Sequence, residues 1–299
     1  LAQEAGQSIK KGLVERMIRH LPASTVRKLG IFAHGEEKVS VHRDEPVFDG
    51  QFSNRCYQSA VRQAFHNFRE KAERSGRYNP ETDERFTEQW SRIIMHLPYA
   101  YQAKRMFPDV FRHDREDTEF WAEVAKHLGP APEPHNSDDP VIIEIWEKAM
   151  DGYRRAISKT PQYQEFHASR IEKGQRASSL IGNQYTGSIF LALMSSFESD
   201  LEENDNLDNQ LLGLCGYGSG AKAKVFEGKV SPRWREVVSR WNLFERLAGR
   251  VAIDHITYEN LHKGLQNGSV VEPEGEFALV EITESGVQEG ARRYEWVGA

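Results

Sequence analysis

Residues 182–226 read GNQYTGSIFLALMSSFESDLEENDNLDNQLLGLCGYGSGAKAKVF. The pattern predicts five features in order: a polar loop, a buried helix (189–197), a strand (211–215), a glycine turn (216–220) and a returning strand (221–226). The loop holding Asn183 and the turn holding Ser219 are then expected to meet at one end of a sheet. Because loops on a rigid sheet present polar groups in fixed positions, this end is the predicted functional site.

An acidic segment, Glu198 to Asn209, separates the predicted helix from the strand. Runs of like charge usually stay in water, so we interpret the segment as a solvated loop. A metal site is the alternative, but no histidine accompanies the carboxylates.

Composition narrows the class of protein. The chain has 299 residues, 38% hydrophobic content and a net charge of -6, which suits one large α/β unit or two domains. The absence of a basic surplus argues against a nucleic-acid partner. No apolar run reaches the roughly 20 residues of a membrane helix. The two cysteines lack CxxC spacing, so a reducing cytoplasm is the expected location.

Helical and strand periodicity extends over most of the chain. We predict helices over 1–30, from an N-cap at Ser53 to Ala72, over 99–128 and 141–157, after Thr160-Pro161, and over 231–241 and 258–265. Extended segments are predicted over 29–41, 277–282 and 294–297, and a helix or strand over 86–95. The four prolines of 129–140 predict a surface loop.

Considered as isolated motifs, these features point to no particular chemistry. The turn over 216–220 is neither a Walker A loop nor a dinucleotide fingerprint, and Ser219 lacks a GxSxG elbow. It is either a plain hairpin turn or a turn whose N–H groups hold an anionic oxygen. Cys56 and Cys215 lie on apolar faces and are predicted to be inert core thiols. His96, next to a proline turn, has the position of a satisfied histidine.

Four segments taken together resemble a known family. GNQYTGSIFLALMSSFE is similar to the GN-x-YT-x-S segment of 3-hydroxy-3-methylglutaryl-CoA synthases, and GYGSGAKAKVF to their YGSG hairpin. PVFDGQFSNRCY (46–57) resembles the family's P-V-x-D-G-x-x-S-x-x-C-Y entry into a helix. MHLPYAYQAKRMF (95–107) resembles its F-H-x-P-[FY] segment. The matches keep the family's order from about residue 46 to the C-terminus.

The resemblance implies a fold and a reaction. The fold is α/β, a thiolase-like layered αβαβα arrangement, present mainly as its C-terminal half with helical insertions. Residues 46–299 form this half, and residues 1–45 are a segment of unclear placement. The reaction is an acyl transfer that condenses acetyl-CoA with acetoacetyl-CoA and releases CoA. No cofactor or metal is implied beyond the CoA thioesters.

Site residues follow by matching position. His96 and Asn183 correspond to the catalytic His and Asn that orient the acetoacetyl carbonyls. Gly218 and Ser219 belong to the YGSG turn beside the thioester oxygen, and Tyr185 lines the pocket. Tyr101 stands where the family usually has a lysine near the CoA phosphates, so Lys104, or the adjacent Arg105, is the expected substitute.

The family's nucleophilic Cys and its proton-transferring Glu have no counterpart in these residues. The leading interpretation is therefore an incomplete synthase of the mevalonate pathway, completed by sequence elsewhere and forming a homodimer or a complex with the missing half. The first alternative is a non-catalytic acyl-CoA-binding or scaffold subunit. The second is a polyketide β-branching synthase, which shares the fold.

Overall fold

A computed structural model describes residues 50–81, 84–133, 136–137, 139–218, 221–266 and 268–298. The helix predicted over 1–30, the extended segment over 29–41 and Ser219 lie outside these residues. The chain divides into two compact units, of which the first ends at Phe244 and the second begins at Glu245.

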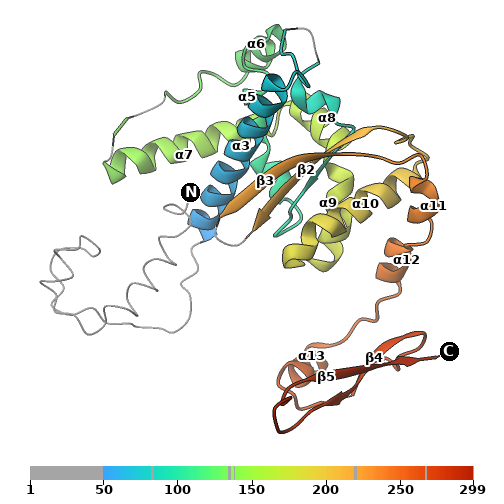
Figure 1. Cartoon of the computed structure of the whole chain (residues 1–299). Helices are drawn as coiled ribbons and strands as arrows, with labels where there is room; N and C mark the ends of the chain where they lie inside the picture. Colours follow the sequence, from blue (N-terminus) through green and yellow to red (C-terminus); the bar gives the residue numbers. More distant parts are fainter. Residues whose placement is uncertain are drawn as a thin grey trace, which may run out of the picture. The chain divides into compact units, whose positions relative to one another are not determined.

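The first unit surrounds a three-stranded sheet with helices (Figure 1). Its strands are β1 (Arg92–Met95), β2 (Leu211–Gly218) and β3 (Lys222–Lys229). Its longer helices are α3 (Gly50–Arg74), α6 (Glu119–Lys126), α7 (Pro140–Ile157), α8 (Pro161–Arg170), α9 (Glu172–Ile181) and α10 (Ser188–Glu202). Shorter helical pieces are η1 (Phe86–Gln89), α4 (Gln102–Met106), α5 (Pro108–His113), η2 (Tyr185–Gly187), α11 (Trp234–Val238) and α12 (Leu243–Ala248), which runs into the second unit.

The sheet has the order β1-β2-β3, with β1 parallel to β2 and β3 antiparallel to it. This confirms the predicted hairpin, although the strands run further than expected and Gly218 still pairs with Lys222. At Gly213 a Cβ atom would lie 2.1 Å from the ring of Trp90, so only glycine fits at that position in β2.

The two faces of the sheet are covered by different helices. Trp90, which contacts Gly213 on one face, packs edge-on against Phe65 of α3 with ring centroids 5.7 Å apart. The adjacent Leu212 points to the other face and belongs to a second core with Phe197 of α10. Alternation along β2 therefore places α3 on one face and α10 on the other.

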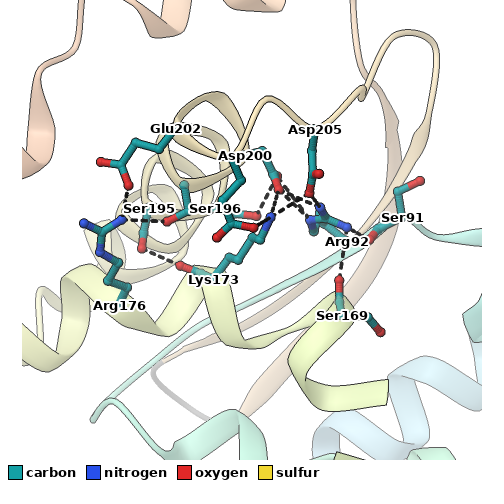
Figure 2. Close-up of polar contacts among 12 residues, drawn as sticks. Ser91, Arg92, Ser169, Lys173, Arg176, Ser195, Ser196, Asp200, Glu202 and Asp205 are labelled. Carbon is teal, nitrogen blue, oxygen red and sulfur yellow. Dashed lines mark hydrogen bonds and ion pairs between the residues drawn. The ribbon is translucent and has the colours of Figure 1, made fainter. Parts of the chain in front are cut away.

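The prediction for the acidic segment was wrong in part. The solvated loop predicted over Glu198–Asn209 begins instead as the last turn of α10, and Asp200 is fully buried. Figure 2 shows why: Arg92 and Lys173 approach the Asp200 carboxylate at 2.6 and 2.7 Å. Both cations also bind Asp205, at 2.7 and 2.6 Å. Paired in this way, a carboxylate no longer requires water.

The same contacts fix the direction of α10. Its C-terminal Asp200 binds Arg92 at the start of β1. Its N-terminal Ile189 approaches Gly216 near the end of β2, where the Ile189 Cδ1 atom lies 4.0 Å from the position of a glycine Cβ. The helix therefore runs antiparallel to β1 and β2. Its N-terminus, and the loop before it, lie at the C-terminal end of these strands.

Asp200→Asn is expected to lower the free energy of unfolding by about 3 kcal/mol, because two cations would keep a neutral partner in a buried position. The measurement is urea unfolding at constant m-value. Glu202→Gln is the control: Glu202 binds Arg176 at the surface, where an ion pair contributes at most about 1 kcal/mol. Equal losses in both variants would show that the buried network is not what stabilises this end of α10.

Helix predictions had mixed outcomes. Helix α7 confirms the amphipathic segment over 141–157, and Thr160 caps α8 by accepting the Tyr163 N–H as predicted. The prediction that Ser53 is the N-cap is wrong, because α3 begins at Gly50 and already includes this residue. The helix over 189–197 exists within α10 but is not buried all round, since Phe190 is 63% exposed.

Three other predicted segments differ from the structure in their boundaries. The helical segment over 99–128 contains three helices, α4, α5 and α6. The segment over 86–95 is divided between η1 and β1. The helix predicted over 231–241 shortens to α11.

The second unit contains α13 (His255–His262) and an antiparallel pair, β4 (Glu276–Ile282) and β5 (Arg292–Val297). Helix α13 starts three residues before the predicted position, because Asp254 accepts the Thr257 N–H and caps it. The two strands confirm the predictions over 277–282 and 294–297. Across the part of the chain that the structure describes, no helix is long and apolar enough to cross a membrane.

Candidate active site

His96 lies directly after β1 and is held through its backbone. Its N–H donates to the Cys215 carbonyl at 3.0 Å, which extends the ladder between β1 and β2 by one residue. Its own carbonyl accepts the Tyr57 hydroxyl at 2.7 Å. The imidazole is half-buried, and burial lowers its pKa below the ordinary value. A neutral imidazole at this position can accept a proton on one ring nitrogen and donate a hydrogen bond from the other.

Asn183 lies in the loop between α9 and α10. Gly182, with φ 79°, ends α9 in a backbone conformation that favours glycine. The Asn183 Oδ1 atom accepts the Tyr185 N–H at 2.7 Å and the Ser188 hydroxyl at 3.1 Å. Because the oxygen is engaged by the loop itself, the NH₂ group is the part of this exposed amide that can donate to a ligand carbonyl.

Tyr185 has an unusual conformation for its type. Its φ is 48°, in the left-handed region, and its side chain is 80% exposed. Strained non-glycine residues of this kind concentrate at functional sites. Because the ring is so exposed, it lines no enclosed pocket among the described residues.

The residues predicted to lie near the CoA phosphates are on α4. Lys104 is partly buried, and its carbonyl accepts the Tyr163 hydroxyl at 3.0 Å. Tyr101 is the N-cap residue of this helix and is 66% exposed. The neighbouring Arg105 donates to the Tyr99 hydroxyl at 2.8 Å. Lys104 is therefore fixed through its backbone, and Arg105 is engaged through its guanidinium.

The two cysteines are core residues, as predicted. Cys215 is fully buried in β2, and burial raises the pKa of its thiol to about 12. Cys56 is buried on α3. A buried thiol with a raised pKa forms little thiolate and is a poor nucleophile.

Three of the predicted site segments share one end of the sheet. His96 follows β1, Gly218 ends β2, and the antiparallel direction of α10 brings the loop of Asn183 to the same end. Ser219 follows Gly218 and lies outside the described residues. Tyr57 and Tyr217 lie in matched segments but were assigned no role from the sequence; their rings lie 6.4 and 6.3 Å from that of His96.

The family follows from a direct comparison. Residues 38–267 match the family model described as hydroxymethylglutaryl-coenzyme A synthase C terminal. The chain belongs to this family. The match includes His96 and Asn183, and it ends nine residues before β4.

Curated synthases give the same result. The hydroxymethylglutaryl-CoA synthase of Haloferax volcanii is 28% identical over 258 residues, which cover 84% of this chain and 54% of that protein. The enzyme of Saccharomyces cerevisiae is 22% identical over 218 residues, 72% of this chain and 41% of that one. The chain thus spans about half the length of the curated synthases that it matches.

Solved structures confirm the thiolase-like fold. MvaS in complex with 3-hydroxy-3-methylglutaryl coenzyme A is 27% identical, with a TM-score of 0.62 over 86% of this chain and 53% of that one. PksG, an HMG-CoA synthase from Bacillus subtilis, is 15% identical with a TM-score of 0.54, over 85% of this chain and 53% of its own. At that identity the second likeness shows the fold alone.

A separate cavity lies away from the predicted site residues. A cavity of about 600 Å³ lies between α3 and α5, lined by Arg69, His113 and Asp114 among others, and none of the predicted site residues lines it. Among the described residues, no group of three His, Cys, Asp or Glu side chains has the arrangement of a metal site.

Proposed function

We propose that this chain is the acetoacetyl-orienting half of a hydroxymethylglutaryl-CoA synthase. In this proposal acetyl-CoA and acetoacetyl-CoA condense at the end of the sheet that carries His96 and Asn183, and the product serves the mevalonate pathway. The nucleophilic Cys and the Glu come from sequence outside these 299 residues. The observation that carries the proposal is the meeting of the His96 and Asn183 segments at one end of the sheet, within a chain that matches the family over 38–267.

The chemistry of the two side chains supports this assignment. A neutral imidazole at His96 can donate a hydrogen bond to the ketone of acetoacetyl-CoA and so stabilise the alkoxide that forms when the new carbon–carbon bond closes. The proton that the base removes from the acetyl methyl group balances the proton that this alkoxide gains. The NH₂ group of Asn183 can donate to the same oxygen or to the thioester carbonyl. Hydrogen bonds aimed at oxygens that gain charge stabilise the transition state more than the substrate.

Exposed apolar side chains near Asn183 support the inference that another part of the synthase covers this surface. Three large side chains, Leu180, Tyr185 and Phe190, are between 46% and 80% exposed on either side of Asn183. All three lie within seven residues of Asn183 in sequence, so a partner that packs on this end of the sheet would cover them. We infer that the first half of the synthase covers them, in a cytoplasmic homodimer or in a complex of two different chains.

The rival assignments have less support. A non-catalytic acyl-CoA-binding or scaffold subunit would need neither His96 nor the Asn183 loop in working geometry. For a polyketide β-branching synthase there is no specific observation: PksG and the HMG synthase of the curacin biosynthetic pathway match at 15–17% identity, which shows the fold alone. MvaS, which was solved with 3-hydroxy-3-methylglutaryl coenzyme A, is more similar in sequence and in fold.

The test is a condensation assay on the protein as it occurs, with any chain that co-purifies. Labelled acetyl-CoA and acetoacetyl-CoA should yield labelled 3-hydroxy-3-methylglutaryl-CoA and free CoA. Thioester binding without any product would support the scaffold alternative instead.

Asn183→Ala is expected to lower kcat by about fivefold, because one neutral hydrogen bond to the transition state contributes about 1 kcal/mol. The measurement is the steady-state rate of CoA release. Asn206→Ala is the control, since the Asn206 Oδ1 atom also accepts the N–H two residues ahead, that of Asp208 at 2.9 Å, but lies in the loop between α10 and β2. An unchanged kcat in Asn183→Ala would remove this amide from the site.

A further inference from the structure

Tyr57 has a contact that no sequence pattern indicated. It lies on α3, is 1% exposed, and donates its hydroxyl proton to the carbonyl of His96 across 39 residues of sequence. Its ring packs at 4.5 Å, centroid to centroid, against Tyr217 at the end of β2. One side chain thus connects α3, the residue after β1 and the residue before Gly218.

The backbone of His96 is therefore held from two sides. Its N–H is bound to the Cys215 carbonyl of β2, and its C=O is bound by the Tyr57 hydroxyl of α3. The next residue, Leu97, is 1% exposed and anchors the chain in the core, and Pro98 restricts the φ angle after it. Of the two hydrogen bonds, the one from Tyr57 is made by a side chain and can be removed by substitution.

We propose that Tyr57 is a positioning residue for His96, fixing the peptide group of His96 so that its imidazole meets the substrate ketone. This inference rests on the proposed function for its consequence in turnover, but the restraint itself can be measured without any reaction. Displacing a catalytic group by about 1 Å can lower the reaction rate by about 10²-fold. A single hydrogen bond that fixes the backbone of such a group can therefore have a large effect on the rate.

Tyr57 and Tyr217 also bury the imidazole of His96. The rings of Tyr57 and Tyr217 lie beside the imidazole, and desolvation lowers its pKa. Two titratable groups beside it are these phenols, from α3 and β2. Burial raises the pKa of both, so they are uncharged at neutral pH. A loosened His96 would gain contact with water, and its pKa would rise toward the ordinary value near 6.5.

Tyr57→Phe is the appropriate variant, because it removes the hydroxyl and keeps the ring in the core. Tyr163→Phe is the matched control: Tyr163 is also fully buried and also donates to a backbone carbonyl, that of Lys104 at 3.0 Å. Both variants lose one buried hydrogen bond of the same kind. Only the first loses it at His96.

The experiment titrates the His96 ring by NMR in the full chain, together with any chain that co-purifies, using His96→Gln to assign the signal. Tyr57→Phe should raise the pKa of His96 by about half a unit or more, while Tyr163→Phe should leave it unchanged. In the condensation assay, Tyr57→Phe should lower kcat by about tenfold with KM changed less than about twofold.

The possible results separate the two ideas. If the wild-type protein shows no condensation, the proposed function fails, and the titration still decides whether Tyr57 holds His96. If Tyr57→Phe gives the wild-type His96 pKa and the wild-type kcat, Tyr57 only fills the core and the inference is wrong. A pKa that rises equally in Tyr163→Phe would also overturn it, because the effect would then be general loosening.

Discussion

Replacing His96 by alanine should lower the rate of condensation by about 10²-fold or more. A positioned general acid–base group contributes this much, and none of the neighbouring phenols can replace it near pH 7, since burial raises the pKa of both Tyr57 and Tyr217. The first half-reaction, transfer of acetyl to the Cys of the other half, should be affected much less. The measurement is therefore twofold: labelled acetyl bound to protein, and labelled product formed.

The pH profile gives a second readout of the same variant. Burial lowers the pKa of His96, so the neutral imidazole persists below pH 6.5 and activity should fall only as the pH drops through the lowered value. In His96→Ala this acid limb should disappear from the residual rate. His66→Ala is the control, because His66 is exposed on α3 and its pairing is with Glu70 at the surface. Condensation at the wild-type rate in His96→Ala would reduce His96 to a turn histidine.

Local chemistry made much of the fold predictable. The hairpin of β2 and β3 follows from apolar segments around a glycine turn, and the start of α8 follows from Thr160-Pro161. In each case the residues that decide the structure are neighbours in sequence.

The acidic segment shows where that reasoning ends. Nothing near Asp200 in sequence predicts its burial, because its cations, Lys173 and Arg92, are 27 and 108 residues away. Charge density is a local property, whereas pairing is a property of the fold. A carboxylate in such a segment is exposed by default and buried only where tertiary structure brings cations to it.

Only some residues of the candidate site could be predicted from the sequence. His96 and Asn183 were identified by family resemblance, while their residue types alone indicated an ordinary turn histidine and a loop amide. Tyr57 was missed, since its hydrogen bond to His96 joins a helix to the end of a strand. No periodicity along either segment marks a contact between backbone and side chain at that separation.

The 299 residues tested alone should give no condensation at all. The reaction needs a nucleophile that holds the acetyl group and a base that removes its methyl proton. By family resemblance, neither has a counterpart in this chain. The cysteines that are present are buried, and with a pKa of about 12 the Cys215 thiol would be ionised to only about one part in 10⁴ at pH 8.

The assay incubates the chain with labelled acetyl-CoA and acetoacetyl-CoA, and follows CoA release and protein-bound acetyl by intact mass. We expect binding of thioester without turnover or adduct, because His96, Asn183 and Lys104 remain in the chain while the nucleophile does not. The control is the double variant Cys56→Ser and Cys215→Ser. If the wild-type chain forms an acetyl adduct that this variant lacks, one of the buried cysteines must become exposed and act as the nucleophile. In that case the chain would need no second half to begin the reaction, and the exposed apolar side chains around Asn183 would require a different partner.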